Sequence, residues 1–340
     1  MKHRSPQIMK FDIITIGTAT RDVFVKSDSF HVDPDHHVLG GKGLVMPLGA
    51  KLEIPEIFFS TGGGATNAAV TLSRQGHKTA CIAVIGNDDS GHAVLRDLEQ
   101  EKIYTGFIRQ EKDATAFALL LEPKSGERTV LVHRGVSEHL KPVFIPWNEL
   151  DTKWLYISSL AGNLVLLKRL VTFAHAHHIR VAYNPGGKEL NQRAALLPLL
   201  KHVEVLIVNR EEASLITGVA FEKEKEIFRV WDSMSPGINV MTDARNGLWV
   251  SDGAHIYHAG IFKEKKIMDR TGAGDAFGSG FVASLIDAPK DIDRAIRLGS
   301  ANATSKVEGM GAKHGLLTKK EFGENSRWKR LSITKISINS

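Results

Sequence analysis

The sequence predicts an α/β fold of three layers (α/β/α), in which helices cover both faces of a mostly parallel β-sheet, together with a small additional β-sheet. Short apolar runs typical of buried strands alternate with helical patterns along most of the 340 residues. A second set of segments alternates apolar and polar residues, as half-covered strands do. The chain is 42% hydrophobic and 24% charged, which is typical of a globular protein with a sizeable core.

The N-terminal part supplies the first strand, the small sheet and a glycine-rich turn. Residues 1–10 are polar and expected to be flexible, and FDIITIG (11–17) is typical of a buried strand that ends at a glycine. RDVFV and KLEIPEIFFS alternate, and TAFALLLEP and RTVLVHRG are typical of two extended segments that the turn KSGE joins. GGGATNAAVTLSRQG opens a helix that leads to the strand KTACIAVIG. We therefore expect the small sheet to come from about residues 22–60 and 107–134.

The C-terminal part resumes the alternation of strand and helix. WLYISS, IRVAYNP and VEVLIVN are predicted strands with helices between them, and INVMTD, GLWVSD and HIYHAG are three closely spaced strands. GAGDAFGSGFVASLI and DIDRAIRLGSANATSKV have long helical patterns. Since no linker forces a division, residues 11–325 are predicted to form one domain. Residues 326–340 are a basic C-terminal tail or an edge strand, and the pattern does not decide between them.

Composition and charge exclude several classes of function. The net charge is +6, but the lysines and arginines are dispersed, which argues against a nucleic-acid partner. The single cysteine, Cys81, excludes an internal disulfide and a cysteine metal site. No apolar run approaches the roughly 20 residues of a membrane span, and the basic N-terminus lacks the apolar segment of a secretion signal. These features predict a cytoplasmic protein that acts on small molecules, without a membrane or nucleic-acid partner.

The strongest chemical signal is MDRTGAGDAFGSGF at residues 268–281. Gly272, Ala273 and Gly274 leave the backbone bare where a helix begins, and Asp275 lies in the first turn. Amide groups at a helix N-terminus bind anions, so they can stabilise charge on a transferring phosphoryl group. Asp275 would then deprotonate the attacking hydroxyl. The alternative is that Asp275 only caps the helix and the glycines form a tight turn.

Together, GGGATNAAVTLSRQG and DRTGAGDAF resemble the signatures of the ribokinase-like (PfkB) family of carbohydrate kinases. The order of strands extends the resemblance from about Phe11 to about Phe322. The resemblance implies a Rossmann-like, ribokinase-like fold whose small sheet is a lid over the substrate. It also implies an ATP-dependent phosphotransferase that phosphorylates a hydroxyl of a sugar, with Asp275 as catalytic base and the backbone of residues 272–274 beside it.

By this resemblance, four residues would lie in the sugar pocket: Asp22 after the first strand, and Gly62, Gly63 and Asn67 in the glycine-rich turn. The residue types agree, because polyols are recognised by convergent short polar groups and glycines let a substrate approach the backbone. Arg134 is a further candidate for a substrate contact; otherwise it is an exposed cation at a strand end.

NREE after VEVLIV matches the family's Asn-x-x-Glu pattern through Asn209 and Glu212. The resemblance implies a magnesium site near this pair on the nucleotide side, and a carboxylate suits an ion that keeps several waters. The same spacing is that of a helix capping box. Both interpretations can hold at once.

MTDARNG takes the place of the family's nucleotide-contacting strand end, which makes Thr242, Asp243 and Gly247 candidates for the ATP site. The commoner Thr-Leu-Gly is replaced here by Thr-Asp-Ala, which weakens the assignment of Asp243. Asn302, on the last long helix, stands where the family often contacts the adenine.

Two further features concern the signature itself. Arg270 replaces the usual threonine, and it is either a phosphate or acidic-group contact or a surface cation. The resemblance also allows a potassium site formed by backbone oxygens around Asp269 and a late loop, because some relatives have one; the spacing alone does not show it.

The same features fit two functions other than a sugar kinase, and they also suggest how the chain assembles. A nucleoside kinase of the same fold is one, with Phe24 or Phe117 stacking on a base or packing in the lid. A non-catalytic sugar-binding protein is the other, although a pure binder does not need a base such as Asp275. The alternating lid strands would leave edges that a second copy can cover, so a homodimer through the lid sheet is expected.

Overall fold

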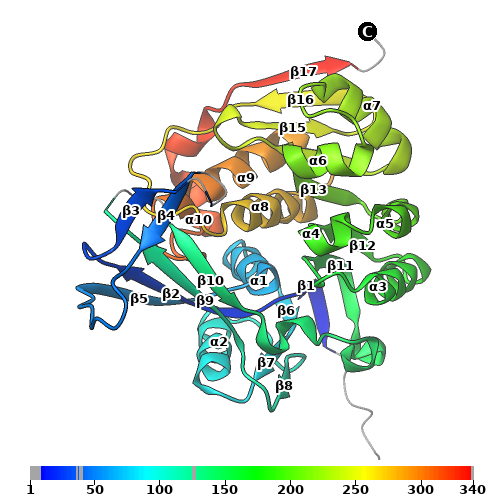
Figure 1. The fold of residues 1–340 in the computed structure, drawn as a ribbon. Coiled ribbons are helices and arrows are strands. Elements are labelled where there is room, and N and C mark those ends of the chain that lie inside the picture. The colour runs from blue at the N-terminus through cyan, green and yellow to red at the C-terminus, as the bar shows by residue number, and fades with distance from the viewer. Residues whose placement is uncertain (1–8, 36, 38–40, 125–127, 338–340) are drawn as a thin grey trace, which may run out of the picture.

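A large twisted sheet forms the centre of the computed structural model, which describes residues 9–35, 37, 41–124 and 128–337 (Figure 1). Its nine strands run in the order β17-β16-β15-β14-β13-β12-β11-β1-β6. Pairing is parallel from β14 to β6 and antiparallel from β14 to β17. The strands are β1 (Lys10–Ile16), β6 (Thr79–Ile82), β11 (Asp151–Ile157), β12 (Arg180–Tyr183), β13 (Val205–Asn209), β14 (Ile238–Thr242), β15 (Leu248–Ser251), β16 (His255–Ala259) and β17 (Ile333–Ser337).

Helices cover both faces of this sheet, so the predicted three-layer fold is confirmed. On one face lie α1 (Gly64–Arg74), α8 (Ala273–Asp287), α9 (Ile292–Val307) and the short α10 (Lys319–Glu324). On the other lie α3 (Leu164–Ala176), α4 (Gly187–Leu190), α5 (Arg193–Leu200), α6 (Arg210–Thr217) and α7 (Glu224–Met234). Short 3₁₀ turns occupy Gly135–Glu138, Pro142–Phe144, Trp147–Glu149, Ala244–Asn246 and Ser326–Lys329.

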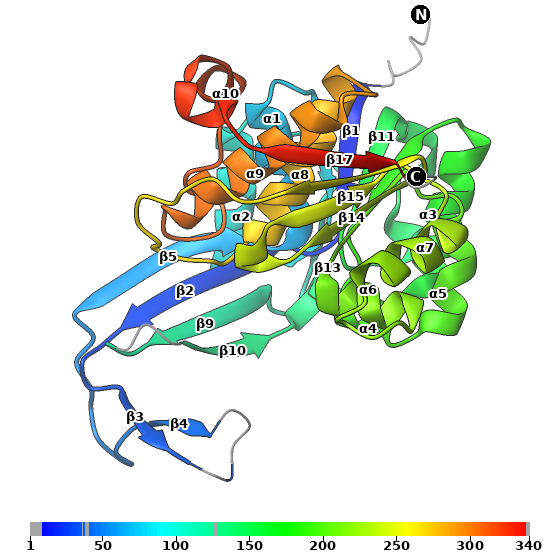
Figure 2. The same cartoon turned by 90° about the horizontal axis from the view of Figure 1, so that it is seen from above.

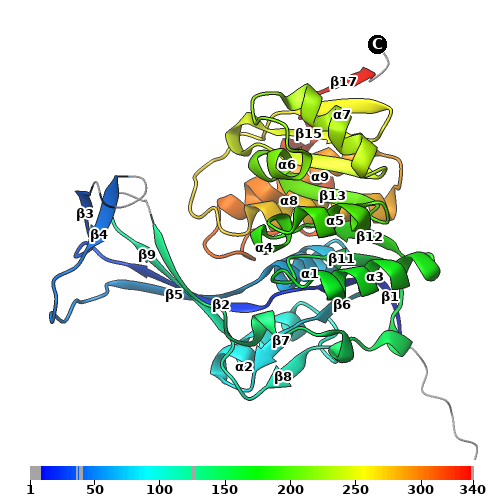
Figure 3. The same ribbon diagram turned by 45° about the vertical axis from the view of Figure 1, so that its right-hand side comes forward.

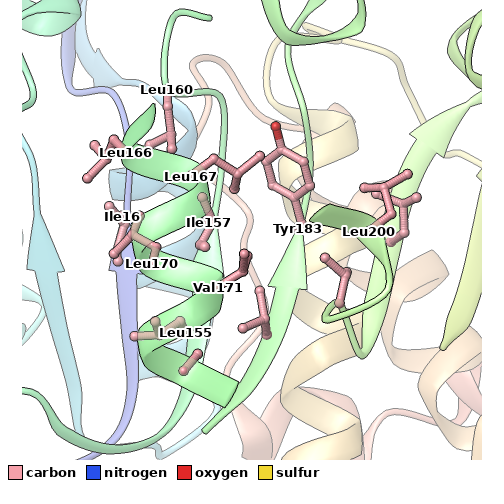
Figure 4. Packing of buried hydrophobic residues seen from close by; sticks show 14 of the residues in the cluster. Ile16, Leu155, Ile157, Leu160, Leu166, Leu167, Leu170, Val171, Tyr183 and Leu200 are labelled. Carbon is pink, nitrogen blue, oxygen red and sulfur yellow. The ribbon is translucent and has the colours of Figure 1, made fainter. Parts of the chain in front are cut away.

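Alternate residues of each central strand enter two different cores, as the two-residue repeat of a strand requires. Leu155 and Ile157 pack with Leu167 and Leu170 of α3 (Figure 4). Their neighbours Trp154 and Tyr156 pack instead with side chains of α8, among them Phe277 and Phe281. This double burial explains why the strands appear in the sequence as continuous apolar runs.

The small sheet projects from one end of the body (Figures 2 and 3). Its order is β10-β9-β2-β5, with β2 parallel to β9 and antiparallel to β5. The strands are β2 (Thr20–Lys26), β5 (Glu56–Gly62), β9 (Ala116–Glu122) and β10 (Thr129–His133); the hairpin of β3 (His31–Pro34) and β4 (Lys42–Val45) lies at the far end (Figure 2). Beneath it, α2 (Asp89–Gln100) contacts β2 and β5, and β7 (Val84–Gly86) pairs with β8 (Arg109–Glu111).

The structure describes the chain from residue 9 near the N-terminus to residue 337 near the C-terminus. Of the N-terminal segment expected to be flexible, residues 1–8 lie outside the described residues, and Lys10 begins β1. At the C-terminus, β17 pairs with β16 and forms the edge of the large sheet. Of the two alternatives for residues 326–340, the edge strand therefore holds for 333–337.

Cys81 lies in β6 with no exposed surface. Burial raises the pKa of its thiol to about 11. Its role is packing in the core under α1 and α2. No helix within the described part of the chain has the length and apolar character needed to cross a lipid bilayer.

Candidate active site

The start of α8 is the bare backbone turn that the sequence predicts. Gly272 adopts a φ of 75° just before the first helical residue, and a Cβ there would lie 2.9 Å from the Cβ of Ala312. A side chain at this position would therefore be both strained and crowded. The first amide groups of a helix have no partner within the helix, so the turn directs donors towards the space around Asp275.

Asp275 is held from α1. The amide Nδ2 of Asn67 donates to its Oδ2 at 2.8 Å, a contact between residues 208 positions apart. Burial raises the pKa of Asp275, and the hydrogen bond from Asn67 opposes that shift. The other amide atom of Asn67, Oδ1, is buried and has no hydrogen-bond partner among the described residues. The pair thus presents a carboxylate of raised basicity and an unused acceptor side by side.

Three consecutive glycines, from the end of β5 to the first residue of α1, connect this pair to Asp22. A Cβ at Gly62 would lie 2.3 Å from Oδ2 of Asp22, and one at Gly64 would lie 3.5 Å from Oδ1 of Asp275. Gly63 has a φ of 99° and lies directly against the backbone of residues 18 and 19. Asp22 is 5% exposed and accepts a hydrogen bond from Thr20 at 2.9 Å. Burial raises the pKa of Asp22, against the effect of that bond.

A pocket of about 260 Å³ has Asp275 in its wall. It opens at the carboxyl ends of β12, β13 and β14, where ligands bind in open α/β sheets. Its lining is mostly polar or bare backbone: Asn184, Pro185, Ile207, Val208, Asn209, Glu212, Thr242, Arg270, Gly272, Ala273, Gly274 and Asp275. Of the predicted nucleotide-side residues, Asn209, Glu212 and Thr242 are thus brought together with the α8 turn.

Asn209 and Glu212 form a complete capping box at the start of α6. Oδ1 of Asn209 accepts from the Glu212 amide at 2.8 Å, and Oε2 of Glu212 accepts from the Asn209 amide at 2.8 Å. Burial raises the pKa of Glu212, and the amide bond opposes it. Residues 9–35, 37, 41–124 and 128–337 contain no cluster of three acidic, histidine or cysteine ligands. One carboxylate beside a polar pocket nevertheless suits magnesium, which takes few protein ligands and keeps its waters.

Three predicted site residues lie elsewhere. Oδ2 of Asp243 is 2.9 Å from Nη1 of Arg210, and both side chains are largely buried. Gly247, with a φ of 92°, accepts from the Asp243 amide at 2.8 Å and completes the turn into β15. The side chain of Arg134 is 68% exposed and lies 3.9 Å from Glu138. Neither Asp243 nor Gly247 lines the 260 Å³ pocket, and their contacts serve the local fold.

Asn302 is fully buried in α9. Its Nδ2 donates to Ala276 and Thr71, at 2.8 and 3.1 Å, and its Oδ1 accepts from the Leu317 amide at 2.8 Å. The residue therefore joins α1, α8 and α9 to the following loop. This position gives it a structural role in place of the adenine contact that the resemblance implied.

A second cluster of polar side chains is centred on Asp269; the sequence indicated only the backbone around this residue, not the charged partners of its side chain. Its carboxylate accepts from Thr271 (backbone at 2.9 Å and hydroxyl at 2.7 Å) and from the Gly311 amide at 3.1 Å, and it pairs with Arg128. The ammonium of Lys306 lies 2.7 Å from the backbone oxygen of Asp269. Lys306 follows Asn302 by one helical turn on the buried face of α9, and a charge at that spacing was the available signal.

Known proteins share both the sequence pattern and the fold. The family model of pfkB carbohydrate kinases matches residues 13–319. The ribokinase of Haemophilus influenzae is 28% identical over 274 residues, covering 76% of this chain and 85% of that protein. The cytidine kinase of Thermococcus kodakarensis is 28% identical over 279 residues, covering 79% and 93%. Arabidopsis thaliana ribokinase, solved with ribose and ATP, has a TM-score of 0.76 at 16% identity over 95% of this chain and all of that one.

Proposed function

Since this chain belongs to the pfkB family of carbohydrate kinases and is an ATP-dependent kinase, we propose that it phosphorylates a sugar hydroxyl with Asp275 as the catalytic base. The contact between Asn67 and Asp275 carries this proposal. It joins the two sequence signatures at one point, next to the glycines that pack against Asp22 and at the wall of the polar pocket that contains Glu212. Phosphoryl transfer needs the acceptor hydroxyl and the phosphoryl donor to meet at one catalytic group, and Asp275 has this position.

The acceptor side supports recognition of a polyol. Asp22 and Asn67 offer acceptor atoms, and the glycines between them let the residues around Asp22 pack closely against the start of α1. The orphaned Oδ1 of Asn67 can accept from a substrate hydroxyl while Nδ2 keeps Asp275 in place. Asp275 then takes the proton of the attacking hydroxyl, and its raised pKa makes it a stronger base than an exposed aspartate.

The donor side suits the phosphates of ATP. Backbone amides of Gly272, Gly274 and Asp275 would provide donors where charge develops, whereas the Ala273 amide donates to the Arg270 carbonyl, and the Arg270 side chain adds a cation at the pocket wall. Glu212 and Asn209 would hold magnesium, mainly through water, and when bound the ion neutralises phosphate charge. Thr242 would contact the nucleotide from the end of β14.

The small sheet would act as a lid. Arg128, at the turn between β9 and β10, pairs with Asp269 and so fastens the sheet beside the site. A closed lid excludes water that would otherwise receive the phosphoryl group. Its edge strands expose apolar side chains (Ile57, Phe58, Phe59, Val130, Leu131 and Val132), and we propose that a second copy of the chain covers them.

A nucleoside is the second candidate acceptor. The cytidine kinase relative is as similar to this chain as the ribokinase relative is. Discrimination between ribose alone and ribose with a base depends on a few contacts in the lid.

The test is turnover with ATP and magnesium across sugars, sugar acids, sugar phosphates and nucleosides, followed as ADP release. We expect one class to react, and Asp275→Asn to remove that activity. Asp291→Asn is the matched control, because Asp291 caps α9 and asparagine keeps the cap. Unchanged turnover in Asp275→Asn, or no turnover by the wild type on any compound, would contradict the proposal.

A further inference from the structure

Lys306 is a lysine in an unusual place. It has no exposed surface, and its ammonium Nζ lies 2.7 Å from the backbone oxygen and 3.4 Å from Oδ2 of Asp269. Lysines are almost never fully buried unless they are paired, because removing the charge from water is costly. The cost is met here by a fixed carbonyl and a carboxylate. The ammonium is therefore held at one defined point.

That point lies at the entrance to the α8 turn. Asp269 accepts from both the amide and the hydroxyl of Thr271, the residue just before Gly272. The same carboxylate accepts from the Gly311 amide in the loop after α9. The amides of Met268 and Asp269 donate to the Val307 carbonyl, next to Lys306. Lys306 thus fixes, through Asp269, the backbone that presents residues 272–275.

The charges agree with this geometry. Burial lowers the pKa of Lys306 to about 8, and the Asp269 carboxylate opposes the shift, so the ammonium form prevails at neutral pH. Burial works against the ionised form of Asp269, but Lys306, Thr271 and Arg128 together hold its pKa below the usual value. The carboxylate therefore already faces two cations.

A bound potassium ion does not fit around Asp269. Such an ion would need oxygens from Asp269 and from the loop near Gly311. The Lys306 ammonium occupies the Asp269 backbone oxygen, and the Gly311 amide points a donor at the carboxylate. A further cation would also be repelled by Lys306 and Arg128.

We propose that the ammonium of Lys306 is a built-in monovalent cation that orders the phosphate-binding turn, so that the kinase works without potassium. Lys306 is in this sense a positioning residue, acting through Asp269 and Thr271. The inference rests on the proposed function for its catalytic part, but the position of the ammonium and its effect on stability stand apart from the choice of substrate.

The first experiment uses the wild-type protein. ADP release and melting temperature are measured in potassium chloride and in tetramethylammonium chloride at equal ionic strength. We expect both quantities to agree between the salts, with rates within about twofold. A fivefold or larger activation by potassium would overturn the proposal.

The second experiment removes the internal cation. In tetramethylammonium chloride, Lys306→Ala should lose at least tenfold in rate and melt at a lower temperature. Potassium or ammonium chloride should then restore at least fivefold of the rate and raise the melting temperature. Lys306→Met, which keeps the volume, follows the same comparison if the alanine variant does not fold. A variant that folds and responds equally to all salts would overturn the proposal.

Lys313→Ala is the matched control. Lys313 is also buried, but its ammonium contacts Thr61 and Asp97, at 2.6 and 2.8 Å. Its loss should show no rescue specific to potassium or ammonium, and such rescue would count against a special role for Lys306. Melting temperatures need no substrate, so they separate failure of this inference from failure of the proposed kinase assignment.

Discussion

Two aspartates at the two ends of one short segment have opposite surroundings. Asp269 is surrounded by Lys306, Arg128, Thr271 and the Gly311 amide, and its pKa is lowered. Asp275, six residues later, receives a hydrogen bond from Asn67, and burial raises its pKa. A carboxylate saturated with donors builds structure, whereas one with few partners stays basic enough to take a proton. The same residue type therefore serves architecture at one end and chemistry at the other.

The largest expected effect is on turnover and comes from replacing Asp275. Asp275→Asn should lower kcat by about 10³-fold, within the range of a lost general base, while leaving ADP affinity nearly unchanged. Turnover and ADP titration measure the two quantities. A kcat that falls less than about tenfold would mean that the raised pKa serves no catalytic purpose.

Replacing Asp269 should instead lower the free energy of unfolding. Asp269→Ala leaves Lys306 buried without its carboxylate partner, and we expect a loss of about 3–5 kcal/mol in unfolding free energy. The control is Asp12→Ala, whose partner Lys153 is 67% exposed and whose loss should cost about 1 kcal/mol or less. Urea denaturation measures both, and equal losses would remove the distinction between the two kinds of ion pair.

Glu212 tests whether a cap also serves the donor pocket. Glu212→Gln keeps an acceptor for the Asn209 amide but removes the charge, so the magnesium needed for half-maximal rate should rise about tenfold. The matched change is Glu321→Gln in the capping box of α10, which does not line the pocket. If both variants keep the wild-type magnesium dependence, Glu212 is a cap alone.

Gly62 extends the comparison to the acceptor side. In Gly62→Ala the new Cβ would lie 2.3 Å from Oδ2 of Asp22 and 2.8 Å from Oγ1 of Thr20, so Asp22 must move. We expect KM for the sugar to rise about tenfold with KM for ATP unchanged. Gly260→Ala is the control, because a Cβ at Gly260 meets open space and, like Gly62, this glycine has no positive φ. An unchanged sugar KM would place the substrate away from Asp22.

The smallest effect concerns pH. Asp275 has a raised pKa, so it favours the folded state at low pH, and that contribution is lost as pH rises through its folded pKa. Asp269 has a lowered pKa and stabilises the fold above the usual aspartate range, until pH falls through its folded pKa. Asp275→Asn should thus melt above the wild type at neutral pH, with the gap closing in acid. Melting curves between pH 4 and 8 measure this, and a constant gap would contradict the raised pKa.

Much of the fold could be predicted from the sequence, because strand and helix patterns and the glycines before a helix are local. The turn at Gly272 and the capping pair at Asn209 are such local features. The ion pair of Lys306 with Asp269 was missed because it depends on how α9 packs, which no short pattern records. Asn302 was assigned to the adenine by position in a family, yet its hydrogen bonds to α1 and α8 use its amide inside the core.

The single thiol provides a way to measure these stabilities. Cys81 lies in β6, the last strand of the large sheet, under α1 and α2; it has no exposed surface, and its thiolate form is suppressed at neutral pH. A thiol-reactive dye therefore reports only molecules in which β6 has opened. The rate of labelling therefore measures how often β6 opens, in the unaltered protein and in every variant above, without an engineered probe.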